Sequence, residues 1–147
     1  MKRFQFSLET LLSLRREREQ ECEIVLASAV GSLVSIDIRI DAARDAGEKA
    51  FLTQGFSIDE LRARDSLWMK SLGDRKALEQ PRKEASKSVD EARKVYAEAH
   101  SKRAVLDKLK DKRKDQWKFR AKQEEIKRLD ETAKGAAVRR RLTGGEE

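Results

Sequence analysis

The chain has 147 residues, of which 41% are charged and only 5% are aromatic, and it contains one proline. A composition with this many charged residues excludes a thick globular core. Leu, Ile, Val and Ala recur at regular spacing, which argues against disorder and favours long helices. One cysteine excludes an internal disulfide. The longest uncharged run, residues 24–36, has 13 residues, fewer than the roughly 20 that span a bilayer. Charged residues from Arg15 onward interrupt any secretory signal, so we expect a soluble, cytoplasmic protein.

The net charge of +7 is unevenly placed along the chain. Residues 1–101 carry 18 Lys/Arg and 18 Asp/Glu, whereas residues 102–147 carry 16 and 9, so the whole excess lies in the last third. This asymmetry fits either an acidic partner for that end or a solvated helix face, and both interpretations stay open.

The first predicted helix covers about residues 8–53. Ser7 is a candidate N-cap, and Glu9 would place a carboxylate in the first turn, where the helix dipole favours it. From Cys22 onward, small and apolar residues recur at alternating steps of four and three, the pattern of a coiled-coil seam. The seam residues are Cys22, Leu26, Ala29, Leu33, Ile36, Ile40, Ala43, Gly47 and Ala50. Towards the amino terminus the same frame meets Arg15 and Glu19, so the seam is less regular there.

The sequence predicts a tight turn at residues 54–57. Gly55 can end the first helix in a left-handed conformation. Ser57 and Glu60 have the spacing of a capping box, and Phe56 and Leu61 have that of a hydrophobic staple. A new helix is therefore expected from Ile58.

The remainder is predicted as a short helix over about 58–72, a kink over 73–81 and a second arm over about 82–135. Gly73 and Pro81 are the reasons for the kink, because proline removes a backbone hydrogen bond. Gly135 would end the arm and leave a frayed basic tail, 136–147. One unbroken second helix that overhangs the first is the alternative. The fold class is all-α: a single elongated domain, 1–147, forming a long antiparallel two-helix coiled coil with a short helical elaboration near the turn.

No motif for catalysis or cofactor binding is visible. A two-helix hairpin offers no cleft, and the sequence has no phosphate loop, nucleophile motif or paired metal ligands, so we expect neither an enzyme nor a cofactor. Cys22 fits a small buried hydrophobe, and His100 a solvated side chain. Trp68 and Trp117 fit a role in filling irregular parts of the coiled coil, or, for Trp68, in an apolar face open to a partner.

The opening stretch FQFSLETLLSLRRERE resembles the amino-terminal signature of the FliJ family, F-x-F-x-L-x-x-L-L-x-L-R followed by a Glu-rich helix. The closing RLDETAKGAAVRRR and the central GFSIDELRARDSLWMKSL are also similar to family segments. Gly73 and Pro81 depart from the smoother helix expected in the family. The YscO-like stalk proteins of injectisomes form the sister family and remain an alternative.

The resemblance implies a component of the flagellar type III export apparatus, peripheral to the inner membrane. Family members insert as a coiled-coil stalk into the hexameric export ATPase, promote its activity, engage the cytoplasmic ring of the export gate and interact with export chaperones. By the stalk analogy the paired chain ends enter the ATPase pore, which would bring together Phe4, Phe6, Leu8, Arg139, Arg140 and Arg141. The hairpin end would face the export gate through Phe51, Phe56, Leu61, Trp68 and Leu72.

Two further classes of function stay open at this stage. A nucleic-acid-associated coiled coil would use the basic last third, but acidic residues are interleaved there and no DNA- or RNA-binding motif is present, so no nucleic acid is expected. A generic scaffold or membrane-surface helix would bind neither ATPase nor nucleic acid. The opening aromatics, Phe4 and Phe6, could fold back on the base of the coiled coil or contact a partner.

Overall fold

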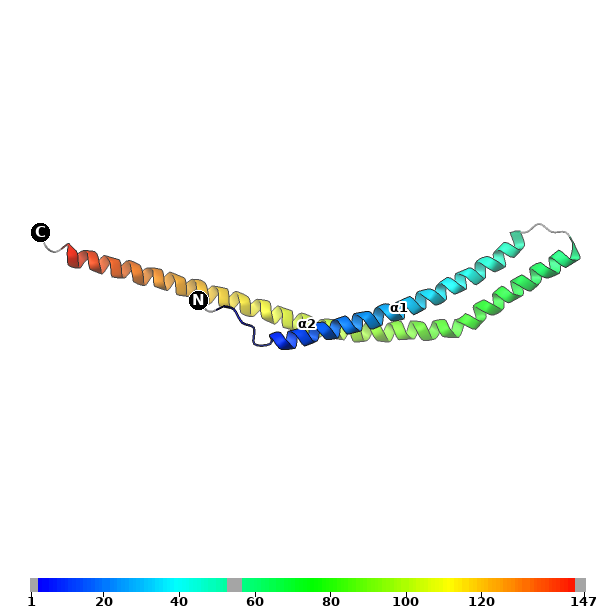
Figure 1. Cartoon of the computed structure of the whole chain (residues 1–147), viewed down its shortest axis with the longest axis horizontal. Coiled ribbons are helices and arrows are strands. Elements are labelled where there is room, and N and C mark those ends of the chain that lie inside the picture. Colours follow the sequence, from blue (N-terminus) through cyan, green and yellow to red (C-terminus); the bar gives the residue numbers. More distant parts are fainter. Residues whose placement is uncertain (1–2, 53–56, 145–147) are drawn as a thin grey trace. The chain divides into compact units, whose positions relative to one another are not determined.

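The computed structural model describes residues 3–52 and 57–144. They form two helices, α1 (Glu9–Leu52) and α2 (Ile58–Thr143), and no strand occurs among these described residues (Figure 1). The predicted all-α class is therefore confirmed, and the first predicted helix agrees with α1 to within one residue at each end.

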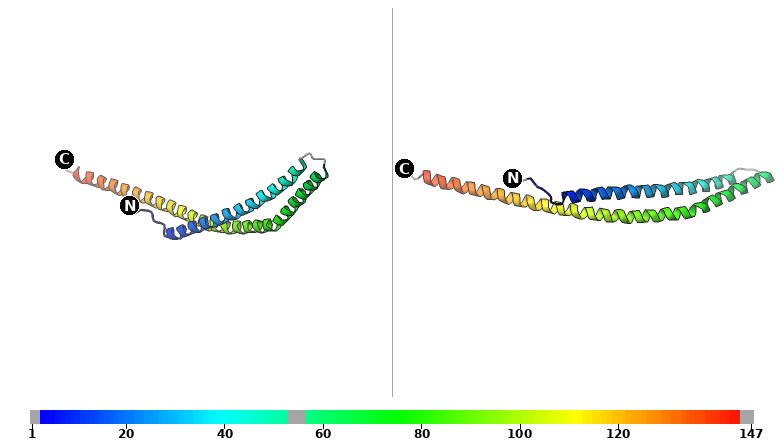
Figure 2. Two further views of the ribbon diagram at one scale, coloured as in Figure 1. Left: turned by 45° about the vertical axis from the view of Figure 1, so that its right-hand side comes forward. Right: turned by 60° about the horizontal axis from the view of Figure 1, so that its bottom comes forward.

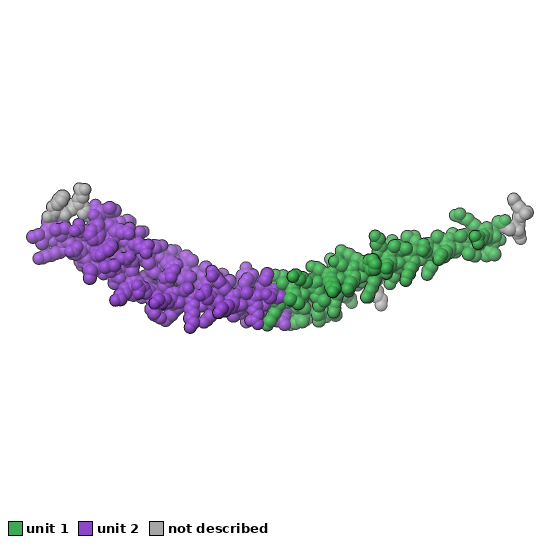
Figure 3. Space-filling model, turned by 180° about the vertical axis from the view of Figure 1, so that it is seen from behind, with its two compact units in different colours: residues 1–14, 102–147 green, residues 15–101 purple. Residues whose placement is uncertain are grey.

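The chain divides into two compact units (Figure 3). The hairpin unit is residues 15–101, and the terminal unit is residues 1–14 with 102–147. In the hairpin unit, α1 and α2 lie side by side and run antiparallel, in agreement with the predicted helical hairpin (Figure 2). In the terminal unit, the described residues from Phe4 to Ser7 lie against the part of α2 that begins at Lys102.

The start of α1 differs from the prediction in its cap. The helix begins at Glu9, and the carbonyl of Leu8 accepts the first helical hydrogen bond, from the Leu12 amide at 2.9 Å. Ser7 Oγ instead accepts a hydrogen bond from Arg113 of α2 at 2.8 Å. The prediction that Ser7 caps α1 is therefore wrong, because the first helical hydrogen bond makes Leu8 the cap position and leaves Ser7 one residue before it, where its hydroxyl faces Arg113.

The start of α2 follows the prediction. The Glu60 amide donates to Ser57 Oγ at 3.2 Å, and the Ser57 amide donates to the Glu60 carboxylate at 3.3 Å. This reciprocal pair is a capping box, and it fixes the helix start at Ile58. The predicted turn at 54–57 and the staple formed by Phe56 fall mostly on residues 53–56, which lie outside the described residues.

The continuity of α2 corrects several predictions. The short helix 58–72, the arm 82–135 and the first part of the frayed tail belong to one helix of 86 residues, which corresponds to the alternative of an unbroken second helix. The helix also continues through 73–81, so no break occurs there. Pro81 lies inside this helix, and Gly135 does not end it. Pro81 is exposed, so water can reach the Ala77 carbonyl that loses its helical donor. The ribbon of α2 bends within its green part, the region that contains Pro81 (Figure 1).

A heptad frame on each helix explains why α2 continues through these helix breakers. All nine predicted seam positions of α1 are buried or half-buried, and the frame extends back through Glu19, Arg15 and Leu12. On α2, positions at alternating steps of four and three run from Arg64 to Trp117 without interruption. They are Arg64, Trp68, Ser71, Arg75, Leu78, Arg82, Ala85, Val89, Ala92, Tyr96, Ala99, Arg103, Leu106, Lys110, Arg113 and Trp117. Packing along this frame stabilises the helix and offsets the local cost of Gly73 and Pro81.

The two helices approach each other closely at Gly47. A Cβ atom at this position would lie 2.5 Å from Ser71 Oγ and 2.8 Å from Ser71 Cβ. Ser71 is buried, and its hydroxyl donates a 2.6 Å hydrogen bond to the Ala43 carbonyl of α1. Glycine at position 47 therefore provides the room in which α2 hydrogen-bonds to the backbone of α1.

Candidate partner-binding surfaces

The opening aromatic motif folds back onto α2 in the terminal unit. Phe6 is only 7% exposed, and the Arg113 guanidinium lies over its ring, 5.6 Å from the ring centroid. Phe4 packs at a tilt against Trp117, with 6.0 Å between the ring centroids. Leu12 is fully buried. We call Phe4, Phe6, Leu12, Arg113 and Trp117 the base cluster. Of the two possibilities for the opening aromatics, folding back on the coiled coil or contacting a partner, the structure has the first.

The predicted set of ATPase-contacting residues is not brought together. Phe4, Phe6 and Leu8 lie at the base of the chain, but α2 continues as a helix to Thr143. Arg139 therefore lies 22 residues beyond Trp117, which is about 33 Å along the helix axis. The expectation that Arg139, Arg140 and Arg141 meet the opening aromatics is wrong, because it treated residues 58–80 as an elaboration and paired the first arm with the last part of the chain, whereas α2 runs unbroken from Ile58 and Phe4 packs on Trp117.

Residues 118–143 of α2, the distal arm, continue past the point where Phe4 packs on Trp117, and no other helix that the structure describes in the terminal unit runs beside them (Figures 1 and 2). Continued past Trp117, the intramolecular frame meets charged residues: Arg120, Glu124, Lys127, Glu131 and Lys134. A new apolar stripe starts two positions away from that frame. It comprises Phe119, Ile126, Leu129, Ala133 and Ala136, at heptad spacing that Lys122 interrupts once, and all but the half-buried Ala136 are exposed. The distal arm thus has the stripe of a coiled coil, but on a different face from the one that packs within the chain.

A second aromatic cluster lies near the hairpin end, in the hairpin unit. Phe51 of α1 and Trp68 of α2 pack edge to face, with 5.1 Å between centroids. The Arg64 guanidinium lies 4.9 Å from the Phe51 centroid, and that of Arg75 lies 5.8 Å from the Trp68 centroid. We call these four residues the tip cluster.

Four of the five residues predicted to face the export gate can be placed. Phe51 is 47% exposed, Leu61 and Leu72 are partly exposed, and Trp68 is half-buried. Phe56 lies outside the described residues. The structure therefore joins Phe51 to Trp68, and it adds two arginines that the sequence reasoning missed.

The missed signal is the set of basic residues that occupy seam positions on α2. Four of them meet an oxygen acceptor in the described chain: Arg82 at Asp37, Arg103 at Asp107, Lys110 at Glu9 and Arg113 at Ser7. The other two, Arg64 and Arg75, have buried Nε atoms with no hydrogen-bond partner. Counting apolar periodicity passes over such residues, because their long stems pack in the seam while the charged heads reach its edge.

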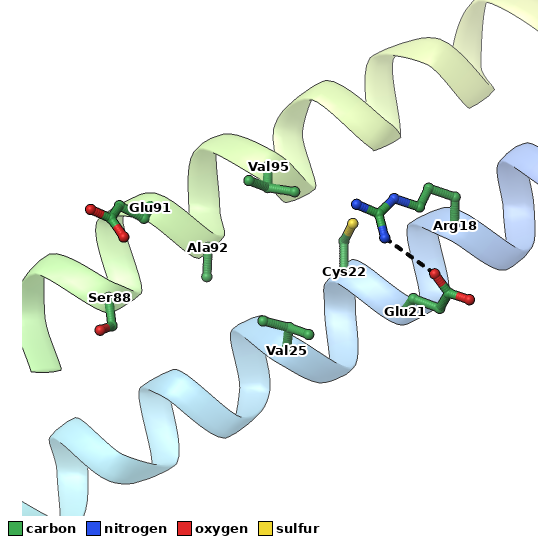
Figure 4. Close-up of a pocket in the computed structure, with 8 residues that line it drawn as sticks. All are labelled: Arg18, Glu21, Cys22, Val25, Ser88, Glu91, Ala92 and Val95. Carbon is green, nitrogen blue, oxygen red and sulfur yellow. Dashed lines mark hydrogen bonds and ion pairs between the residues drawn. The ribbon is translucent and has the colours of Figure 1, made fainter.

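Cys22 lies on the seam beside a groove between α1 and α2, whose walls include Val25, Ala92 and Val95 (Figure 4). Its thiol is buried among these side chains. The sequence left His100 as a solvated side chain. It is about half-exposed, and its Nδ1 lies 2.7 Å from the carboxylate of Glu19, the residue that interrupts the apolar seam of α1.

Neither described helix has a stretch long and apolar enough to cross a membrane. Within the described residues, no group of three or more His, Cys, Asp or Glu side chains is placed to hold a metal ion. The family model described as "Flagellar FliJ protein" matches residues 4–142, nearly the whole chain. No curated protein and no solved structure matches the chain.

Proposed function

Because the chain belongs to the FliJ family and is thus a component of the flagellar type III export apparatus, we propose that it is the coiled-coil stalk of the hexameric export ATPase. In this role it inserts into the ATPase, promotes its activity and links it to the export gate. It performs no chemistry of its own. The proposal places it in the cytoplasm, peripheral to the inner membrane.

The observation that supports the ATPase contact best is the distal arm. It is a stretch of 26 helical residues beside which the described part of the terminal unit has no other helix, and it carries nine Lys/Arg and four Asp/Glu. Its exposed apolar stripe lies on a different face of α2 from the frame that packs within the chain, which becomes charged beyond Trp117. A helix with a free seam and a basic surface suits insertion into an acidic, helix-lined opening.

The tip cluster supports the proposed contact with the export gate. Aromatic and arginine side chains are the residue types that most often dominate the binding energy of protein interfaces. Exposed apolar side chains along α1, including Ile24, Val34 and Ile38, offer further area for the export chaperones that we include among the partners.

The ATPase contact is tested by reversing the charges of Arg139, Arg140 and Arg141 to Glu. We expect weaker binding of the ATPase and weaker stimulation of ATP hydrolysis, with the largest difference at low salt. The control reverses three exposed lysines elsewhere on α2, Lys83, Lys87 and Lys94, which makes the same change in net charge. Equal stimulation by wild type and the arginine variant across a salt series would contradict the proposed contact.

The gate contact is tested separately with the double substitution Trp68→Ala and Leu72→Ala. Capture of the gate's cytoplasmic domain should fall, because the central apolar anchors of the tip are lost. The control is Leu67→Ala with Met69→Ala, which removes exposed apolar side chains from the same helical turns. Capture at the wild-type level by the Trp68 and Leu72 variant would count against the contact.

A further inference from the structure

Arg64 and Arg75 of the tip cluster are the seam cations that lack an acceptor. Each has a buried Nε atom with no hydrogen-bond partner, although the other four basic seam residues all meet an oxygen. A buried polar group without a partner is costly, so native structures usually provide one. The two exceptions occur together, at the end of the hairpin that carries the exposed aromatic ring of Phe51.

Their surroundings fix both guanidinium groups without satisfying them. Arg64 lies over Phe51, and Arg75 lies over Trp68, while the two rings pack edge to face between them. Stacking on an aromatic ring limits the motion of a guanidinium but leaves its terminal NH2 groups available, and these, rather than the buried Nε, are the donors that an outside partner can reach. A planar, positioned set of N–H donors matches a carboxylate, which can accept two parallel hydrogen bonds.

The charge around the cluster distinguishes between possible anions. Residues 41–80 carry seven Lys/Arg and eight Asp/Glu, so the tip has no positive field of the kind that binds nucleic acid or an anionic lipid surface. Recognition here must therefore depend on direct contact with individual carboxylates, beside an apolar anchor, rather than on long-range attraction. These requirements favour an acidic polypeptide segment.

We infer that Arg64 and Arg75 each bind a carboxylate of an acidic segment in the cytoplasmic ring of the export gate, and this rests on the gate contact proposed above. The ring contacts hold the two guanidinium carbons no more than about 16 Å apart, because Arg64 lies 4.9 Å from the Phe51 centroid, the two ring centroids lie 5.1 Å apart, and Arg75 lies 5.8 Å from the Trp68 centroid. The partner's two carboxylates should therefore lie within that distance of each other, at most about 11 positions apart on a helix or about five on an extended segment.

The test measures binding of the gate's cytoplasmic domain to the full chain and to the variant Arg64→Gln with Arg75→Gln. We expect binding to weaken by at least tenfold, since two charge-assisted hydrogen-bond pairs are lost. The matched control is Arg62→Gln with Lys76→Gln, which removes the same charge from exposed positions beside the cluster, and it should stay within about twofold of wild type. Circular dichroism checks that each variant is folded.

A second variant, Arg64→Lys with Arg75→Lys, separates geometry from charge and keeps the aliphatic stems in the seam. It should bind nearly as weakly as the Gln variant, because an ammonium group cannot form the bidentate pair. Wild-type binding by the Lys variant would overturn the bidentate contact. Wild-type binding by the Gln variant, together with loss in Trp68→Ala/Leu72→Ala, would overturn this inference and leave the gate contact standing.

Two further outcomes have distinct meanings. If the wild-type chain does not bind the gate domain at all, the proposed gate contact fails, and this inference fails with it. If a single-stranded oligonucleotide displaces the gate domain from the wild-type chain but not from the Gln variant, the arginines serve a polyanion. The choice of an acidic polypeptide would then be wrong.

Discussion

The base cluster and the tip cluster contain the same residue types in two different states. Each pairs a phenylalanine with a tryptophan and places arginine over an aromatic ring. At the base, Phe6 is 7% exposed and Arg113 donates to Ser7 Oγ, whereas at the tip Phe51 is 47% exposed and the arginine Nε atoms have no acceptor. The comparison teaches that residue type alone does not distinguish a stabilising cluster from a binding surface. Exposure and hydrogen-bond satisfaction do.

The largest expected effect is from Leu12→Ala at the base. Leu12 is fully buried, so its loss should lower the free energy of unfolding by about 3 kcal/mol. Urea unfolding followed by circular dichroism measures the change. Leu14→Ala, at an exposed position two residues on, should cost less than about 1 kcal/mol. If both substitutions lowered the free energy of unfolding by the same amount, Leu12 would not be buried in a packed base cluster.

The next effect compares the two phenylalanines directly. Phe6→Ala should lower the free energy of unfolding by about 2 kcal/mol, less than a central core residue would, because the chain end opens easily. Phe51→Ala should cost about 1 kcal/mol or less in stability, since half of its ring is already exposed, but it should weaken binding of the gate domain. A larger stability loss for Phe51 than for Phe6 would reverse the comparison between the clusters.

The third effect tests the packing beneath the tip. Gly47→Ala should destabilise the hairpin by about 1–2 kcal/mol, because the new methyl group overlaps the buried Ser71 side chain. Gly31→Ala is the matched control within α1. Its added methyl group meets nothing within 4 Å, so it should stabilise the helix by up to about 1 kcal/mol. If the melting temperature shifted in the same direction for both variants, the space between Gly47 and Ser71 would be larger than in the structure.

The fold was predictable where local chemistry decides it. The capping box at Ser57 and Glu60 involves residues three apart, and it forms as the sequence indicates. Ser7 lacks such a partner, because the residue three positions on is Thr10, and its hydroxyl accepts a hydrogen bond from Arg113, 106 positions away. The predictions of a helix break near Pro81 and of a helix end at Gly135 were wrong for a related reason. The local cost of these two residues is real, but packing along a heptad frame and the surrounding helix outweigh it.

The candidate sites were predictable only in part. The sequence identified Phe51 and Trp68 as candidates, because exposed aromatics are rare in this chain, and they do contact each other. It missed Arg64 and Arg75, because a charged residue at a seam position does not register as periodic hydrophobicity. It also placed Arg139 beside Phe4, an error that followed from setting residues 58–80 aside as an elaboration and so starting the paired second arm too late.

The smallest expected effect is on stability, and it separates the two kinds of arginine. Arg113→Gln removes a hydrogen bond to Ser7 and a contact with the Phe6 ring, so it should lower the free energy of unfolding by about 1 kcal/mol. Arg64→Gln also removes a contact with a ring, but at the same time it removes a buried donor without a partner, and these contributions oppose each other. The net change should be close to zero in chemical denaturation. If Arg64→Gln cost as much as Arg113→Gln, Arg64 would be a structural residue satisfied within the fold, and the tip would be as closed as the base.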